Sequence, residues 1–257
     1  MERLLAVGAD SVWVGDPGGS GTPVVLVHPG WGDASIWDGV LDRLPGSIRP
    51  IRYDNRGYGR SPAPTRPFSW HDDLVAVTAD LAGAVVVGHS GGGAAAIGLA
   101  LSHPERVASL LPVTPGVADY PWPPDDYFAR FEALFAADDR DGLVELGLRT
   151  WARADPGPAA RAQVGGAVAA MVACGDLQQP DPPAFDRLHT ITAPSRVLIG
   201  GLDHPSVVDC GHAVAARLPH CELSVIPEAD HLLPLRHPDL VAEAIADLVS
   251  GSRGMPR

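Results

Sequence analysis

The feature that most constrains the fold is an apolar run that leads into a glycine-rich turn and then into a stretch of small residues. Residues 84–87 (AVVV) are typical of a buried strand, and residues 93–101 read as a buried helix. Between them stands GHSGG, residues 88–92. A chain that passes directly from strand to helix must bend sharply, and glycines on both sides of the apex leave room for neighbouring backbone. The pattern therefore predicts a strand–turn–helix unit with Ser90 at its apex.

A serine at this apex suits covalent catalysis. The turn would hold the Ser90 hydroxyl out into a cleft, and the N-terminus of the next helix would face any oxyanion formed there. With 29 glycines in the chain, a G-x-S-x-G match by chance is common enough to make the motif weak evidence alone. The alternative is a glycine-rich loop in which Ser90 only caps a helix. The surrounding sequence has to decide.

Composition bounds the class of protein. The 257 residues suffice for one large α/β domain, and the contents of 46% hydrophobic and 19% charged residues are typical of a globular chain. The net charge of −12 argues against nucleic acid and against anionic membrane surfaces as partners. The acidic residues are spread along the chain, which favours a solvated surface over an acidic tail.

The sequence also bears on location and redox state. Its start has no sustained apolar segment, and no later stretch approaches eighteen uninterrupted apolar residues, so we expect neither a secretion signal nor a membrane span. Three scattered cysteines, Cys174, Cys210 and Cys221, lack metal-ligand spacing and are expected to be free thiols. These features predict a cytoplasmic protein.

Short apolar runs alternate with helix-like segments, which predicts βαβ units and a mostly parallel sheet with helices on both faces. Most of the runs are continuously hydrophobic, as expected for strands covered on both sides. The expected strands are residues 24–28, 48–53, 84–88, 107–113, 195–200 and 222–226, with 11–14 as an edge strand of an N-terminal hairpin. The expected helices are residues 36–44, 70–81, 92–102, 207–217 and 238–249.

One region breaks this alternation. Residues 115–194 contain several helix-like stretches, a proline and aromatic segment at 120–124 and a proline-rich exit at 179–183. Such a length is too great for a simple connection, so the region is interpreted as a helical lid over the strand ends, where open α/β sheets bind ligands. The predicted organisation is a core formed by 1–114 and 195–257 with this lid inserted between the two parts.

A nucleophilic serine needs a base, and the base needs an acid that orients it. Asp203 follows the buried strand 195–200 after a pair of glycines, and His231 stands in the loop after the strand 222–226. Both residues are therefore expected at the carboxyl ends of strands, on the same rim as Ser90. The order serine, acid, histidine is the one that α/β hydrolases use.

On these motifs the chain resembles the α/β-hydrolase-fold enzymes, a group that includes esterases, enol-lactonases, C–C bond hydrolases and cofactor-free haloperoxidases. Residues 27–32 (VHPGWG) resemble the group's His-Gly oxyanion loop, and residues 54–61 (DNRGYGRS) resemble its D-x-R-G-x-G-x-S signature. The resemblance covers nearly the whole chain and is weakest in the lid. It implies an α/β-hydrolase fold with the catalytic set Ser90, Asp203 and His231.

The oxyanion loop departs from the group's pattern. Pro29 stands where glycine is usual, and proline has no N–H to donate. The oxyanion hole is then expected to use the amide of Gly91 with that of Gly30 or Trp31. Alignment by the histidine favours Gly30, whereas alignment by the G-x-G pattern favours Trp31, and the sequence leaves both open.

Two other residues are rivals for the roles of base and acid. His237 is the alternative base and Asp119 the alternative acid, and both have weaker local patterns than His231 and Asp203. Asp230 replaces a glycine that often precedes the histidine, and it is expected either to raise the pKa of His231 or to face solvent.

Other polar residues of these motifs are expected to serve the scaffold. His28 should pack beneath the oxyanion loop, and strand alternation turns His89 away from the side of Ser90. Asp54 and Arg56 are expected to be internal pins that hold their loop. Four tryptophans are expected to be mainly packing residues, namely Trp31, Trp37, Trp122 and Trp151.

The sequence thus predicts a serine hydrolase that cleaves a small carboxylic ester or lactone through an acyl-enzyme on Ser90. The expected partner is a small molecule with an ester, lactone or activated carbonyl, and neither metal nor organic cofactor is expected. Two alternatives stay open at this point: a C–C bond hydrolase of diketone-type ring-fission products, and a small-molecule receptor that retains the triad with little turnover.

Overall fold

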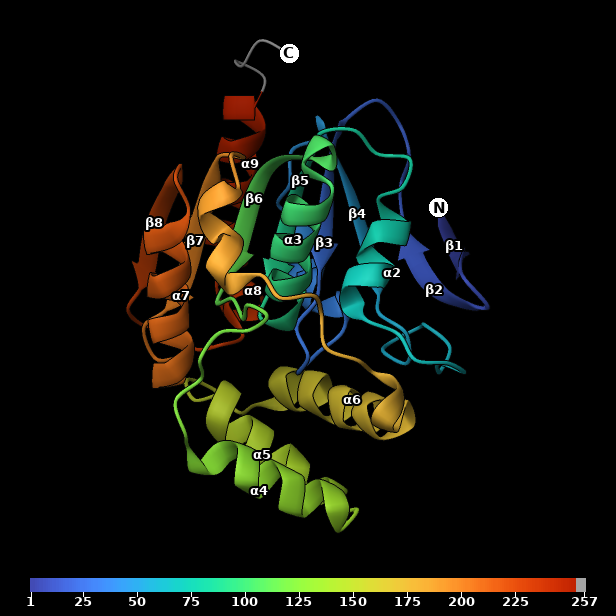
Figure 1. Cartoon of the computed structure of the whole chain (residues 1–257), viewed down its shortest axis with the longest axis vertical. Helices are drawn as coiled ribbons and strands as arrows, with labels where there is room; N and C mark the ends of the chain where they lie inside the picture. Colours follow the sequence, from blue (N-terminus) through green and yellow to red (C-terminus); the bar gives the residue numbers. More distant parts are fainter. Residues whose placement is uncertain (253–257) are drawn as a thin grey trace.

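The computed structural model describes residues 1–252. Within these residues the chain forms one sheet of eight strands in the order β1-β2-β4-β3-β5-β6-β7-β8 (Figure 1). Strand β2 runs antiparallel to both β1 and β4, and the pairs from β4 through β8 are parallel. The strands are β1 (Glu2–Val7), β2 (Asp10–Gly15), β3 (Thr22–Val27), β4 (Ile48–Asp54), β5 (Ala84–His89), β6 (Val107–Val113), β7 (Ser195–Gly200) and β8 (Cys221–Ile226). The mostly parallel α/β sheet predicted from the sequence is confirmed.

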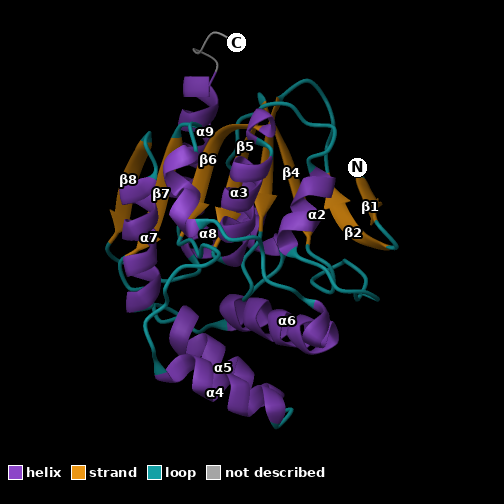
Figure 2. Ribbon diagram, in the orientation of Figure 1, coloured by secondary structure: helices purple, strands orange, loops and turns teal. Residues whose placement is uncertain are grey.

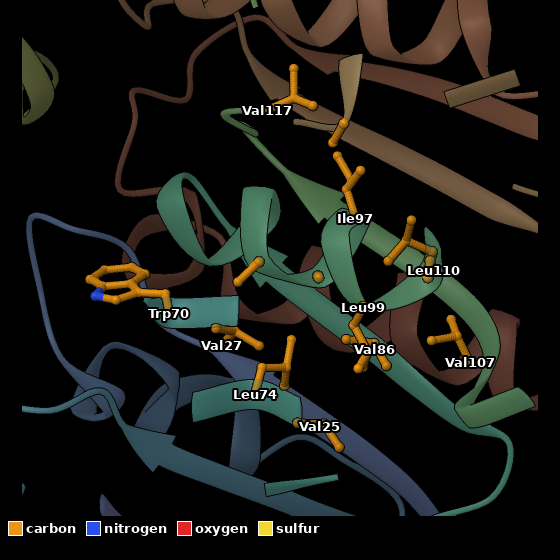
Figure 3. Packing of buried hydrophobic residues seen from close by; sticks show 14 of the residues in the cluster. Val25, Val27, Trp70, Leu74, Val86, Ile97, Leu99, Val107, Leu110 and Val117 are labelled. Carbon is orange, nitrogen blue, oxygen red and sulfur yellow. The ribbon is translucent and has the colours of Figure 1, made fainter. Parts of the chain in front are cut away.

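Helices cover both faces of this sheet (Figure 2). Along β3, Val25 and Val27 pack on the side of α2 and α3, whereas Val24 and Leu26 pack on the side of α1 and α9. Figure 3 shows the first of these clusters, with Val27 among the side chains that it labels. The core helices are α1 (Asp38–Leu41), α2 (Trp70–Val77), α3 (Gly91–Ser102), α7 (Pro205–Arg217), α8 (Leu233–Arg236) and α9 (Pro238–Ser252). Because both faces of the central strands β3 and β5 are buried, these two strands are largely continuous apolar runs, whereas β4 and β8 also carry charged residues.

The chain between β6 and β7 contains α4 (Asp126–Ala136), α5 (Arg140–Trp151) and α6 (Pro158–Cys174), followed by short 3₁₀ turns at Gly175–Leu177 and Phe185–Thr190. Figures 1 and 2 show these helices beyond the arrowheads of the parallel strands. They therefore lie over the rim on which the candidate site residues are expected. Nowhere in residues 1–252 is a helix both long enough and apolar enough to cross a membrane.

Three predicted elements differ from the structure. The helix expected at 36–44 is a 3₁₀ turn, Ala34–Trp37, followed by one turn of α1. The helix expected at 70–81 ends at Val77, because the Thr78 hydroxyl donates to the Leu74 carbonyl at 2.8 Å and the chain leaves helical geometry there. The segment expected to form an edge strand is β2, which lies between β1 and β4, so β1 forms the edge.

The loop after β4 is pinned from within, as the sequence predicted. The Asp54 carboxylate accepts the amides of Ala34 at 2.7 Å and Arg60 at 2.9 Å. Arg56 is buried, and its guanidinium lies 2.6 Å from Asp73 of α2 and 3.3 Å from Asp10. These bonds tie the loop to α2 and to the N-terminal hairpin, so the block is scaffold.

Removal of one partner from this buried ion pair is expected to be costly. Asp73→Ala leaves Arg56 without its nearest carboxylate, and we expect the free energy of unfolding to fall by about 3 kcal/mol in urea denaturation. Asp239→Ala is the matched control, since Asp239 pairs with Arg43 at the surface with 81% of its side chain exposed. That control is expected to change stability by less than about 1 kcal/mol. Equal losses in the two variants would contradict the assignment of Arg56 and Asp73 to the scaffold.

Candidate active site

Ser90 joins β5 to α3 in a strained conformation. Its φ of 55° and ψ of −118° place a non-glycine residue on the left-handed side of the backbone map. The Ser90 amide donates to the Val113 carbonyl at 3.0 Å, and the Ser90 carbonyl accepts the amides of Gly93 at 2.8 Å and Gly116 at 3.0 Å. Bonds to two flanking segments therefore hold the bend in place.

The glycines of the motif are required by close backbone contacts. A Cβ on Gly88 would lie 2.3 Å from the Gly92 carbonyl oxygen, and a Cβ on Gly92 would lie 2.5 Å from the His28 carbonyl oxygen. Real Cβ atoms do not approach so closely, so the strand and helix can meet at this angle only without side chains there. The structural reason given for the motif in the sequence is confirmed.

Asp203 and His231 form a buried pair. Asp203 follows β7 and His231 follows β8, and the Asp203 Oδ2 lies 2.7 Å from the His231 Nδ1 with the two side chains 0% and 1% exposed. The other Asp203 oxygen accepts the His204 amide at 2.6 Å. With Nδ1–H donating to the carboxylate, the lone pair of a neutral imidazole is on Nε2. That Nε2 is buried and has no hydrogen-bond partner among the described residues, so it is free to take a proton.

His89 connects this pair to the turn at Ser90. The His89 Nε2 lies 2.7 Å from the His231 carbonyl oxygen, and the two imidazole centroids are 5.1 Å apart. Thr114, which follows β6, donates its hydroxyl to the same carbonyl at 3.4 Å. The loops that carry Ser90 and His231 are therefore bonded together at the strand ends. No local pattern predicts this contact, because it joins residues 142 positions apart.

The rival residues lie elsewhere. Asp119 is exposed in a left-handed conformation with a φ of 68°, and it is Asp203 that binds His231. His237 stands between α8 and α9, partly exposed, and its amide donates to Leu233 at 2.8 Å. In the structure it is therefore Asp203, and not Asp119, that is hydrogen bonded to His231.

The expectation that Asp230 faces solvent is wrong. Its side chain is fully buried, and its two oxygens accept the amides of Ala154 and Leu232, each at 3.0 Å. The Arg236 Nε lies 3.6 Å away and adds a favourable charge. Because Ala154 belongs to the loop between α5 and α6, Asp230 attaches the helices over the rim to the loop that carries His231.

Trp151, at the end of α5, packs directly on the candidate base. Its ring centroid lies 4.6 Å from that of His231, and its Nε1 donates to the Tyr127 hydroxyl at 3.3 Å. Trp31 lies 6.5 Å from Trp151 and 6.0 Å from Phe131 of α4. These aromatic residues form a wall between the sheet rim and α4 and α5. The sequence predicted packing for Trp151 but not that it covers His231.

The two glycines expected at the oxyanion hole are close to one side chain. A Cβ on Gly30 would lie 3.9 Å from the Trp70 ring, and a Cβ on Gly91 would lie 3.1 Å from it. Beneath the Gly30 loop, the buried His28 pairs its Nδ1 with the Pro29 carbonyl at 2.8 Å and its Nε2 with the Asn55 amide at 3.0 Å. Burial lowers the pKa of His28, so the ring is neutral and supports the loop as predicted.

A cavity of about 830 Å³ opens beside this loop. Gly30, Gly91 and Ala94 line one side of it, and residues 116–119 and 178–183 line others. Its aromatic surface comes from Tyr58, Trp70 and Trp122. Trp31 is not among the described residues that line it, and its indole packs against α4 and α5 instead. A ligand in this cavity would lie against Gly30 and Gly91.

The thiols stand apart from the site. Cys174, Cys210 and Cys221 are free, and burial raises the pKa of Cys174 to about 11 and of Cys210 to about 12. These two cysteines are therefore protonated near neutral pH. Over residues 1–252, histidine, cysteine and acidic side chains nowhere gather in threes as a metal site would need.

The fold and the site together define a hydrolase of the α/β class, and the comparisons identify the family. Residues 24–244 match the model of the alpha/beta hydrolase family, and the chain belongs to that family. A pimeloyl-[acyl-carrier protein] methyl ester esterase of Aromatoleum aromaticum is 30% identical over 89% of this chain and 98% of that protein.

Two solved structures extend the likeness. One, described as Est816, an N-acyl homoserine lactone degrading enzyme, is 26% identical with a TM-score of 0.77, covering 95% of this chain and 99% of that chain. The enol-lactonase from Burkholderia xenovorans shares the fold with a TM-score of 0.80 at 20% identity, covering 96% of this chain and all of that chain (100%). The fold predicted from the sequence is therefore confirmed, and the chain is an enzyme of the hydrolase class.

His89 gives a prediction of pH dependence. Burial lowers its pKa far below the ordinary value, so the ring is neutral in the folded protein and takes up a proton only on unfolding. The unfolded state then binds more protons below about pH 6.5, and stability falls as the pH drops. We expect this residue to contribute up to about 1.4 kcal/mol of lost stability per pH unit between pH 6.5 and 5.5.

The measurement is urea denaturation at several pH values for the wild type and His89→Gln. Glutamine can keep a donor for the His231 carbonyl but does not titrate, so the pH dependence of its unfolding free energy should be shallower over this range. His28 has the same sign and is common to both proteins. Parallel curves for the two proteins would contradict a neutral buried His89.

Proposed function

We propose that this protein is a serine hydrolase that cleaves a small carboxylic ester or lactone through an acyl-enzyme on Ser90. The observation that carries the proposal is the buried Asp203–His231 pair, in which the His231 Nε2 has no hydrogen-bond partner among the described residues. The His231 carbonyl is also bonded to His89, the residue before Ser90. The named relatives add support, since one acts on a methyl ester and another on a lactone. The acyl C–O bond of an ester and that of a lactone are both cleaved after nucleophilic attack on the acyl carbon.

Acylation begins when Ser90 Oγ attacks the carbonyl carbon and its proton passes to His231 Nε2. The carbonyl opens to a tetrahedral oxyanion, which collapses as the bond to the alcohol oxygen breaks. His231 returns the proton to that oxygen, and the acyl group stays on Ser90. Asp203 fixes the imidazole tautomer and stabilises the transient imidazolium.

Deacylation repeats these steps with water. A water molecule gives a proton to His231 Nε2 and attacks the acyl carbon, and collapse of the second oxyanion breaks the bond to Ser90 Oγ. The proton on His231 returns to Ser90, and the acid leaves. For a lactone the released hydroxyl and carboxyl groups belong to one molecule. Protein groups and water complete this cycle.

The amides of Gly91 and Gly30 are the proposed oxyanion donors. Gly91 opens α3, whose N-terminal amides have no partner within the helix. Gly30 lines the same cavity as Gly91, and both contact Trp70. The Trp31 amide stays the alternative. We also propose that residues 115–194 form a lid, because Trp151 covers His231 and Asp230 attaches the loop after α5 to the rim.

The triad is tested by three substitutions. Ser90→Ala and His231→Gln should each lower kcat for p-nitrophenyl acetate at least about 10³-fold, and Asp203→Asn should lower it by about 10⁴-fold because the wrong tautomer results. Ser102→Ala is the matched control. Ser102 ends α3, and its hydroxyl lies 2.9 Å from the His71 Nε2, so it is a second serine near this helix and has a histidine beside it.

Full activity in Ser102→Ala with loss in the three triad variants is the expected result. Loss of activity in Ser102→Ala alone would move the nucleophile to the far end of α3. If the purified wild type instead binds esters and releases no product, the protein is a binding protein rather than an enzyme. Circular dichroism of each variant checks that the fold is intact.

The oxyanion donor is tested at Gly30. Gly30→Pro removes the amide hydrogen, and we expect kcat to fall by about 10²–10³-fold, or about 2.7–4 kcal/mol of transition-state stabilisation. Gly30→Ala keeps the amide, and its Cβ would lie 3.9 Å from the nearest atom, so kcat should change little. Unchanged kcat in a folded Gly30→Pro would assign the second donor to Trp31.

A further inference from the structure

The cavity beside Gly30 and Gly91 has a one-sided charge. The ionisable acids and bases among the described residues that line it are Asp119, Asp181 and the phenol of Tyr58, so the carboxylates are unopposed by arginine or lysine. The remaining surface is mainly the indoles of Trp70 and Trp122, small apolar side chains, prolines and the amides of Gln178 and Gln179. A bound group therefore meets negative charge and aromatic rings.

This cavity lies beside the turn that carries the proposed nucleophile, although Ser90 and His231 are not among the described residues that line it. Gly91 follows Ser90, and Ala94 lies one turn further along α3. On the other side, the Gly116 amide donates to the Ser90 carbonyl at 3.0 Å and begins the segment 116–119 that lines the cavity. A substrate whose carbonyl is held at Ser90 has this cavity as space for one of its chains.

Asp181 is held rigidly in the cavity wall. Its carboxylate accepts the His71 amide at 2.9 Å at the start of α2. In the same segment, 178–183, the Gln179 amide donates to the Phe68 carbonyl at 2.7 Å. Its carboxylate therefore cannot turn away from a ligand without loss of a helix-capping bond. Burial raises the pKa of Asp181, so its charge is complete only above the ordinary range of an aspartate.

Asp119 faces the same cavity from the opposite segment. Its φ of 68° is a conformation that aspartate and asparagine adopt more readily than other non-glycine residues. It is exposed, so its effect on a ligand is partly screened by salt and water. Together the two aspartates put negative charge on two walls.

We propose that Asp119 and Asp181 make this cavity a charge filter, which admits neutral and cationic substrate chains and rejects chains that carry a carboxylate. The inference rests on the proposed function, because it names the substrate class of that site. A carboxylate placed there would lose water and face two like charges, whereas an ammonium group would meet carboxylates and indole faces. The filter gives specificity by repulsion as well as by fit.

The experiment compares three methyl esters of equal chain length at pH 8 and low salt: hexanoate, the monomethyl ester of adipate and 6-aminohexanoate. The wild-type kcat/KM for the adipate ester should be at least about tenfold below that for the hexanoate ester. The 6-aminohexanoate ester should be cleaved at least as well as the hexanoate ester. A second set consists of hexyl acetate and its analogues with a carboxylate or an ammonium group at the end of the alcohol chain. This set tests the orientation in which the alcohol chain, rather than the acyl chain, occupies the cavity.

The variants Asp119→Asn and Asp181→Asn remove charge and keep shape. Asparagine tolerates the left-handed φ at 119, and its amide oxygen can still accept the His71 amide at 181. In the double variant the adipate to hexanoate ratio of kcat/KM should rise several-fold and the 6-aminohexanoate to hexanoate ratio should fall. Asp80→Asn is the control, since it removes an exposed charge away from the cavity and should leave both ratios as in the wild type.

The outcomes separate this inference from the proposed function. Ser90-dependent cleavage of methyl hexanoate or hexyl acetate, with equal rates for all charges in both sets, would overturn the filter and leave the hydrolase standing. Discrimination that persists unchanged in the double variant would also overturn it. Absence of Ser90-dependent cleavage of every ester would overturn both. The filter would be supported if, in the double variant, kcat/KM relative to the neutral ester rose for the anionic ester and fell for the cationic ester.

Discussion

The bend at Ser90 is the constraint on which the rest of the site depends. A residue with a Cβ is held at a φ of 55° where β5 meets α3, and this is possible because Gly88 and Gly92 let backbone approach where side chains could not fit. A hydrogen bond from the Ser90 amide to the Val113 carbonyl and one from the Gly116 amide to the Ser90 carbonyl secure the bend from outside the motif. The strain is thereby balanced by its surroundings, and the hydroxyl stands at the carboxyl rim of the sheet.

The parallel sheet brings the other groups to this rim. Asp203 and His231 follow β7 and β8, and their mutual bond is buried. His89 then ties the His231 backbone to the strand that bears Ser90. The helices over the rim contribute as well, since Trp151 lies on the His231 ring and Asp230 binds the loop after α5. Hydrogen bonds and ring contacts thus join His231, Asp203 and the loop after α5.

Sequence reasoning reached the local features and missed the long-range contacts. Continuous apolar runs and the glycines around Ser90 predicted the fold, because these patterns lie in neighbouring residues. The same reasoning selected Asp203 and His231, and the structure places a hydrogen bond between them. The burial of Asp230 and the contact from His89 to His231 depend on loops that meet only in the folded chain. The helix expected at 36–44 is instead a 3₁₀ turn followed by one α-helical turn at 38–41, since 3₁₀ and α turns share the same residue pattern.

The most direct test of the central claim is peptide mass spectrometry of the wild type quenched in acid during turnover of p-nitrophenyl acetate. The account predicts one acetyl group per chain, located by fragmentation on Ser90, and its disappearance as the substrate is exhausted. The assignment of Ser90 as the nucleophile would be contradicted by an acetyl group on Ser102 or on a histidine. It would also be contradicted if no acetyl-enzyme accumulated during steady turnover.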